Sequence, residues 1–179
     1  MTASVPFAER RNIKMKKCLA AVLSLLLLLA LLPAQADTLN EEEFLLLGET
    51  GLTMWISPEL KAMPLDEETA EAGYLGYFED EKTGSSLDIL LTANEEPLTV
   101  ESYAAFLKEA DTGAEEIKIE TINGIPCVTW LFPDETIAIK QLAWVSENND
   151  LLVLTFIPYS DPVFAAKTDA MINSLKKAQ

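Results

Sequence analysis

The sequence predicts an α+β domain: an antiparallel β-sheet of hairpins and a C-terminal meander, with helices packed on its faces as in an α/β/α sandwich. Three observations support this class. The chain has 179 residues, of which 49% are hydrophobic, enough for one ordinary domain. Strand and turn patterns alternate with two helical patterns. The last strands, such as residues 151–157, are apolar on both sides, and a sheet buried on both faces needs covering layers.

Two hairpins are predicted in the first half of the chain. The apolar runs 44–47 and 52–56 flank a glycine-bearing turn. The runs 74–78 and 86–92 flank a longer polar turn that ends at Gly84.

Two helices are predicted from their capping residues. Thr99 is a good N-cap for an amphipathic segment that Gly113 ends. Asp161-Pro162 begins the second helix, because proline suits the first helical position. We expect Lys176-Lys177 in the last turn of that helix, where cations complement the helix dipole.

The meander between these helices is predicted as four strands, 116–122, 125–132, 136–145 and 151–157. Asn123-Gly124, between the first two, is the strongest short hairpin signal in the chain. Its tryptophans, Trp130 and Trp144, fall on neighbouring strands and are candidate cross-strand partners.

The N-terminal segment has the composition of a secretory signal peptide. Residues 10–17 are basic, residues 19–32 are apolar and uncharged, and Ala34-Gln35-Ala36 is a small-x-small cleavage site. The apolar stretch is shorter than the ~20 residues of a membrane-spanning helix. Both Met1 and Met15 are candidate starts.

We therefore expect residues 1–36 to be an N-terminal extension and signal peptide, and residues 37–179 to be a single secreted domain, extracellular or, with an outer membrane, periplasmic. Once the chain is cleaved after Ala36, we expect no integral membrane segment to remain. Cys18 precedes the apolar run, so it does not fit a lipid-anchor site. Cys127 lies in an apolar run and is predicted to be a buried, unreactive thiol.

The charge of the chain excludes several classes of function. The net charge is −16, and removal of residues 1–36 leaves 8 basic against 28 acidic residues. Such a surface repels nucleic acid and anionic lipid. The chain has no histidine, which excludes Ser-His-Asp and Cys-His catalysis and histidine metal sites.

The order of these elements resembles the PsbP-like fold, shared by small secreted bacterial proteins of unknown role. The resemblance covers about residues 51–176. It is carried by Trp55-Ile56-Ser57-Pro58 after an early strand, Thr99-x-x-x-Tyr103 at the first helix, Asn123-Gly124-Ile125-Pro126 at the meander turn, and Ile172-Asn173-Ser174-Leu175 at the end. The resemblance implies an adaptor or assembly factor more than an enzyme. The manganese and photosystem associations of plant members do not transfer, because no matching site residues are present.

The acidic clusters predict no catalytic residue, no cofactor and no specific metal site. Most of these acids fall in turns and at helix ends, where a carboxylate is ordinarily solvated. Asp88 comes closest to a buried acid, but alternation places it on the outer face of its strand. The calcium-loop pattern is missing, so at most weak, diffuse Ca²⁺ binding is expected. Nucleotide-binding and esterase motifs are also missing.

We predict a non-enzymatic protein-binding or assembly module whose partner presents a basic surface. The aromatic residues we expect to be most exposed are Tyr74 and Tyr77, on the stem of an acid-tipped hairpin with Glu79, Asp80 and Glu81. Aromatic anchors inside a polar rim are typical of interface hot spots. The alternatives are a small-molecule or glycan-binding module that uses the sheet aromatics and a carboxylate-dependent hydrolase. A large aromatic-lined pocket would favour the first alternative, and a buried acid pair would favour the second.

Overall fold

A computed structural model describes residues 44–110, 112–134 and 136–178, and every structural statement below concerns those residues. The predicted signal peptide, its predicted cleavage site and Cys18 lie outside them.

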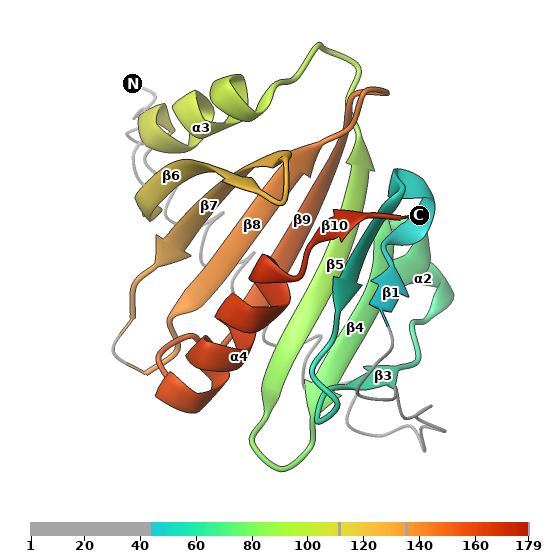
Figure 1. Cartoon of the computed structure of the whole chain (residues 1–179), viewed down its shortest axis with the longest axis vertical. Helices are drawn as coiled ribbons and strands as arrows, with labels where there is room; N and C mark the ends of the chain where they lie inside the picture. Colours follow the sequence, from blue (N-terminus) through green and yellow to red (C-terminus); the bar gives the residue numbers. More distant parts are fainter. Residues whose placement is uncertain (1–43, 111, 135, 179) are drawn as a thin grey trace, which may run out of the picture. The chain divides into compact units, whose positions relative to one another are not determined.

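The domain is built on a seven-stranded antiparallel sheet and a three-stranded antiparallel sheet (Figure 1). The order of the large sheet is β3-β4-β5-β9-β8-β7-β6 and that of the small sheet is β1-β2-β10. The strands are β1 (Phe44–Leu46), β2 (Leu52–Trp55), β3 (Lys61–Met63), β4 (Tyr74–Asp80), β5 (Ser85–Ala93), β6 (Glu115–Ile122), β7 (Ile125–Phe132), β8 (Ile139–Val145), β9 (Asp150–Ile157) and β10 (Lys176–Lys177). The helices are the 3-10 turn η2 (Gly48–Thr50), α2 (Glu67–Glu71), α3 (Val100–Glu109) and α4 (Pro162–Asn173). The predicted α+β class is confirmed.

Both predicted hairpins and the start of each predicted helix are confirmed. β1 pairs with β2 and β4 pairs with β5. The Thr99 side chain accepts from the backbone N–H of Ser102 in a capping box. Asp161 accepts from the N–H groups of Val163 and Phe164, with Pro162 in the first turn.

The turn between β6 and β7 has the backbone that its sequence predicts. Asn123 and Gly124 have φ angles of 50° and 82°, as a tight hairpin turn with two left-handed residues requires. The Asn123 side chain also donates to the carbonyls of Asn173 and Leu175, at 2.9 Å each. It therefore joins the turn to the end of α4.

The end of the last helix differs from the prediction. Lys176 and Lys177 do not belong to the last turn of α4 but form β10, where they pair with Thr53 and Leu52. Leu175, which is fully buried, precedes this strand. The backbone pairing with β2, in which Lys176 lies opposite Thr53 123 residues away along the chain, overrides the local helix-dipole preference.

Two cores lie on opposite faces of the large sheet, as predicted from the strands that are apolar on both faces. On one face, Leu142, Leu154 and Phe156 pack with Phe164 and Met171 of α4 and with the inner face of the small sheet. In Figure 1, α4 and the small sheet lie in front of this face. On the other face, residues of α3 pack on β7, β8 and β9: Val100, Ala104, Leu107, Val128, Trp130, Ala143 and Val153.

The two meander tryptophans belong to different cores. Trp130 lies opposite Gln141 and is buried in the core beneath α3. Trp144 packs against the core on the opposite face. The expectation that they are cross-strand partners is therefore wrong, because their positions on β7 and β8 differ in side-chain parity.

Candidate functional site

The hairpin proposed as an interface does not present its aromatic residues as expected. Tyr77 is only 7% exposed and Tyr74 is half-buried. The Tyr77 hydroxyl donates to Glu79 at 2.9 Å, and burial, together with that carboxylate, raises the pKa of Tyr77 strongly. The expectation of an exposed Tyr77 is wrong, because its side chain is buried and its hydroxyl is bonded to Glu79.

Of the acids in the same hairpin, one holds the turn together and another is exposed to solvent. Asp80 accepts from the N–H of Lys82 and from the hydroxyl of Thr83, each at 2.9 Å, and so holds the turn together. Glu81 is exposed at the tip, beside Lys82. A cavity of about 210 Å³ lies next to them, lined by Pro58, Glu59 and Lys61. The five residues Tyr74, Tyr77, Glu79, Asp80 and Glu81 are thus close together, but they form no exposed aromatic anchor.

A polar row crosses the middle of the sheet on the face that carries α3. Tyr77, Asp88, Thr155, Gln141 and Trp130 lie opposite one another on β4, β5, β9, β8 and β7. Gln141 donates to the Thr155 hydroxyl at 2.6 Å. The indole N–H of Trp130 is buried and has no hydrogen-bond partner in the described part of the chain.

Asp88 supplies the carboxyl group of this row. Asp88 is partly buried on the sheet face that carries α3, and burial raises its pKa to about 6. Its neighbours across the strands, Tyr77 and Thr155, are neutral. The row itself contains one carboxylate, and Glu79, two residues along β4, brings a second one to the Tyr77 hydroxyl.

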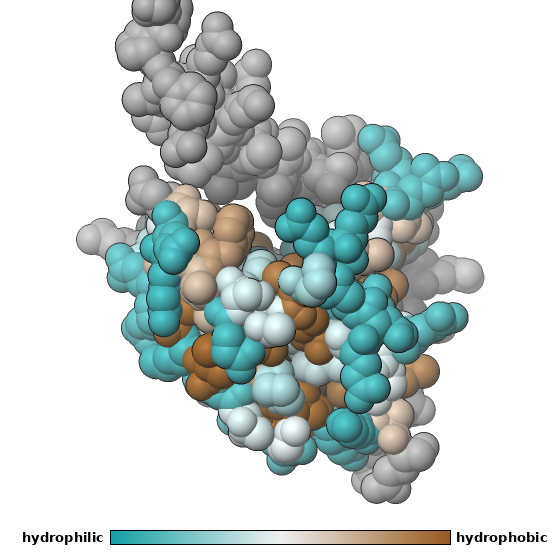
Figure 2. Space-filling view, turned by 90° about the horizontal axis from the view of Figure 1, so that it is seen from above, coloured by the Kyte–Doolittle hydropathy of each residue, from teal (hydrophilic) through white to brown (hydrophobic). Residues whose placement is uncertain are grey.

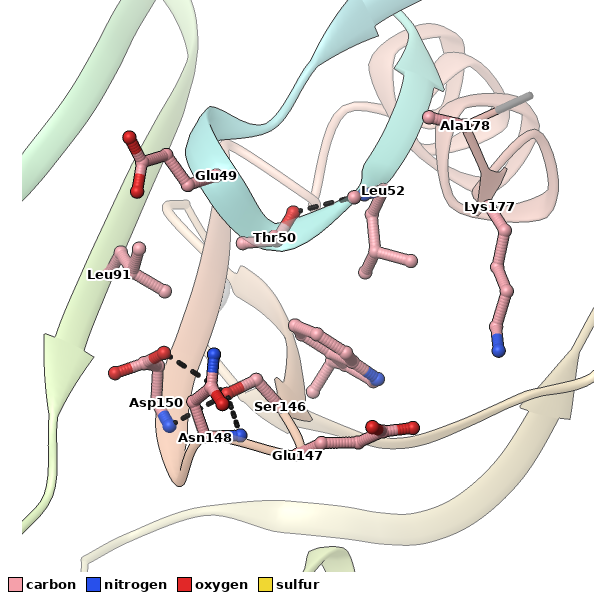
Figure 3. A pocket seen from close by; sticks show the side chains of 12 residues that line it. Glu49, Thr50, Leu52, Leu91, Ser146, Glu147, Asn148, Asp150, Lys177 and Ala178 are labelled. Atoms are coloured by element: carbon pink, nitrogen blue, oxygen red, sulfur yellow. Dashed lines mark hydrogen bonds between the residues drawn. The ribbon is translucent and has the colours of Figure 1, made fainter.

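A larger cleft lies where the small sheet and the large sheet separate (Figure 3). Its volume is about 590 Å³, within the range of roughly 300–1,000 Å³ typical of ligand sites. Four separate parts of the chain line it: the η2–β2 turn, β5, the end of β8 with the β8–β9 turn, and the C-terminal strand. The lining residues are Glu49, Thr50, Gly51, Leu52, Leu91, Trp144, Ser146, Glu147, Asn148, Asp150, Lys177 and Ala178.

Hydrogen bonds make both turns of the cleft rigid. In the first turn, the Thr50 hydroxyl donates to the Leu47 carbonyl at 2.6 Å and accepts from the N–H of Leu52. In the second, the Ser146 hydroxyl donates to the Asp150 carboxylate at 3.1 Å and accepts from the Asp150 N–H. A preformed wall loses little conformational entropy when a ligand binds.

The apolar wall and the charged rim of the cleft are distinct. Leu52, Leu91 and the partly buried Trp144 form the wall. Glu49 and Glu147 are exposed at the rim, and within the described chain neither takes part in an ion pair. In Figure 3, Glu49 and Asp150 lie on one side of the cleft, and Glu147 and Lys177 lie on the other.

The surface around this end of the domain is largely hydrophilic. Seen from above in Figure 2, teal side chains predominate at the edges, with apolar side chains showing between them. Three carboxylates and one ammonium group line the cleft, which gives it a negative charge in a chain that is itself acidic. Such a site attracts cations and repels anions.

Other chemistry finds less support in the described residues. Cys127 is fully buried, as predicted, and burial raises the pKa of its thiol to about 12, so it is not a nucleophile. Within residues 44–178, leaving aside 111 and 135, no cluster of three acids or thiols is arranged to hold a metal ion. The same residues contain no helix of the length and hydrophobicity that a membrane crossing requires.

Comparison with protein-family models and with curated proteins finds no match for this sequence. The assignment of a function therefore rests on the geometry of the site, and the PsbP-like resemblance stays a prediction.

Sequence patterns did not indicate the cleft. Its walls are contributed by residues 49–52, 91, 144–150 and 177–178, which come together only after both sheets form. The one available signal was the set of sheet aromatics, to which Trp144 belongs.

Proposed function

We propose that this protein is a secreted, non-enzymatic binding module that holds a basic segment of a partner protein in the cleft beside Trp144. The observation that carries the proposal is the cleft itself: an aromatic and aliphatic wall with carboxylates at its rim. Tryptophan is the best aromatic partner for an ammonium or guanidinium group. The nearby carboxylates add Coulomb attraction, and the net charge of −16 steers basic partners toward the surface.

The residues of the cleft are better suited to binding a peptide side chain than to catalysing a reaction. Of its carboxylates, Asp150 accepts from Ser146, whereas Glu49 and Glu147 have no ion-pair partner among the described residues and can accept from a ligand. The arrangement provides recognition groups on two sides. The perturbed acid, Asp88, is not among the cleft residues.

Binding of an oligolysine peptide tests this proposal. We expect the purified protein to bind acetylated pentalysine in isothermal titration calorimetry and to bind pentaglutamate negligibly, with weaker pentalysine binding at higher salt. The double variant Glu49→Gln/Glu147→Gln should weaken pentalysine binding about three- to tenfold, because it removes the two free rim carboxylates.

The matched control removes two exposed carboxylates from α3. The variant Glu101→Gln/Glu109→Gln changes the net charge by the same amount but lies outside the cleft. Its affinity should stay within about twofold of the wild type. Equal losses in both variants would show that binding depends on overall charge and would contradict a site at the cleft.

A further inference from the structure

Two adjacent lysines of β10 point in opposite directions. Lys176 lies over the ring of Phe44, with its ammonium 3.4 Å from the ring centroid. Lys177 is paired with Leu52 and, like Leu52, lines the cleft. This alternation follows from the strand geometry, in which successive side chains point to opposite faces. Pairing with β2 therefore places one ammonium group in an otherwise acidic cleft.

The cleft consequently offers free charges of both signs. Lys177 and Glu147 lie on one side of it and Glu49 on the other, with the Glu49 carboxylate pointing away from Lys177 (Figure 3). The two ion pairs of the described chain are Lys118–Glu116 and Lys167–Glu59, so Lys177 forms none despite the carboxylates that share its cleft. An ion pair between Lys177 and these acids would neutralise the site. Their separation leaves donors and acceptors for a ligand that carries both charges.

We infer that the segment bound in the cleft is the carboxyl-terminal end of a partner chain whose last residue is basic. This inference rests on the proposed function and adds the chemistry of the bound end. The terminal carboxylate is held by Lys177, the terminal side chain lies along Trp144, and its cationic group is attracted by the rim carboxylates Glu49 and Glu147 on the two sides of the cleft. No residue in the interior of a chain offers a carboxylate next to its own basic side chain, so Lys177 sets the preference for a chain end.

The size and position of the cleft agree with this ligand. A volume of about 590 Å³ accommodates a long terminal side chain together with its backbone. Lys177 belongs to an ordered strand, since the next residue, Ala178, donates its N–H to the Gly51 carbonyl at 2.8 Å. The ammonium group is thus attached close to a fixed backbone position, which favours recognition of a group at a defined place.

Two peptides that differ in one group test the inference. Acetyl-Ala-Ala-Ala-Arg with a free carboxylate has no net charge, whereas the same peptide with a terminal amide is a cation. Attraction to the acidic protein as a whole favours the amide. We expect the wild type to bind the free acid about fivefold more tightly, against this general attraction.

Substitution of each β10 lysine in turn shows which of the two causes the preference for the free acid. The variant Lys177→Gln should lose the preference for the free acid, and the control Lys176→Gln, on the opposite face of the same strand, should retain it. Equal wild-type affinity for the two peptides, or a preference that survives in Lys177→Gln, would overturn the inference while leaving the proposed function in place. If neither peptide nor pentalysine binds at millimolar concentration, both proposals are overturned.

Discussion

The two faces of the seven-stranded sheet are stabilised in different ways. The face beneath α4 and the small sheet carries a continuous apolar core, in which Leu142, Leu154 and Phe156 are fully buried. The opposite face is apolar beneath α3 but carries a polar row through Asp88, Thr155 and Gln141. One face is optimised for packing, and the other includes a carboxyl group that is costly to bury. We expect the first face to contribute most of the stability.

The sharpest test of this difference compares two neighbours on β9. Leu154 is fully buried in the core under α4, and Val153, 9% exposed, faces α3. Leu154→Ala should lower the free energy of unfolding by about 2–5 kcal/mol, because it leaves a cavity that packed neighbours cannot fill. Val153→Ala should cost roughly half as much. Urea denaturation of both variants checks the order, and a larger loss at Val153 would reverse the comparison.

A gain of stability is expected on the polar face. Because the pKa of Asp88 is about 6 in the folded protein and its ordinary value is 3.8, the folded state binds more protons than the unfolded state between these values. The contribution of Asp88 therefore falls as pH rises from about 4 to 6, and the ionised group destabilises the fold at pH 7.5. Asp88→Asn should stabilise the protein there by about 1–3 kcal/mol, and the gain should vanish below about pH 4.

The control for Asp88 is Glu101→Gln, which removes an exposed carboxylate of α3. Urea denaturation of both variants at pH 7.5 and pH 4 separates the effect of burial from that of net charge. A loss of stability in Asp88→Asn at pH 7.5 would show that the carboxylate is better satisfied than its surroundings indicate.

The smallest predicted effect concerns the attachment of α3. Thr99→Ala removes the oxygen that accepts from the Ser102 N–H and should cost about 1 kcal/mol. Amide exchange should become faster in α3 but not in α4, which Asp161 caps independently. Faster exchange in both helices would show that the two faces unfold as one cooperative unit and that the comparison does not extend to local stability.

Much of the fold follows from local sequence patterns. Asn123-Gly124, Thr99 and Asp161-Pro162 act within a few residues of themselves, through turn geometry and helix capping. Cys127 follows from the apolar character of its strand. These features hold wherever the segment lies in the fold, so the sequence alone predicts them.

The predicted interface shows where local patterns are insufficient. Tyr74 and Tyr77 border a polar turn, a position typical of exposed aromatics, yet Tyr77 is buried and bonded to Glu79. The burial of a strand residue depends on which face is covered, and periodicity does not specify the covering layer. The same reason applies to Asp88, whose alternation is as predicted but whose side chain is partly buried.

The sequence by itself determined the α+β class, the hairpins, the helix caps and the acidic character of the chain. Only the tertiary structure decided the pairing of β10 with β2, the assignment of Trp130 and Trp144 to different cores, and the cleft lined by Glu49, Trp144 and Lys177. Caps and turns depend on neighbours in the chain, and their energies are local. A cleft depends on groups more than 100 residues apart, whose positions are specified by the packing of two sheets and by no pattern within one segment.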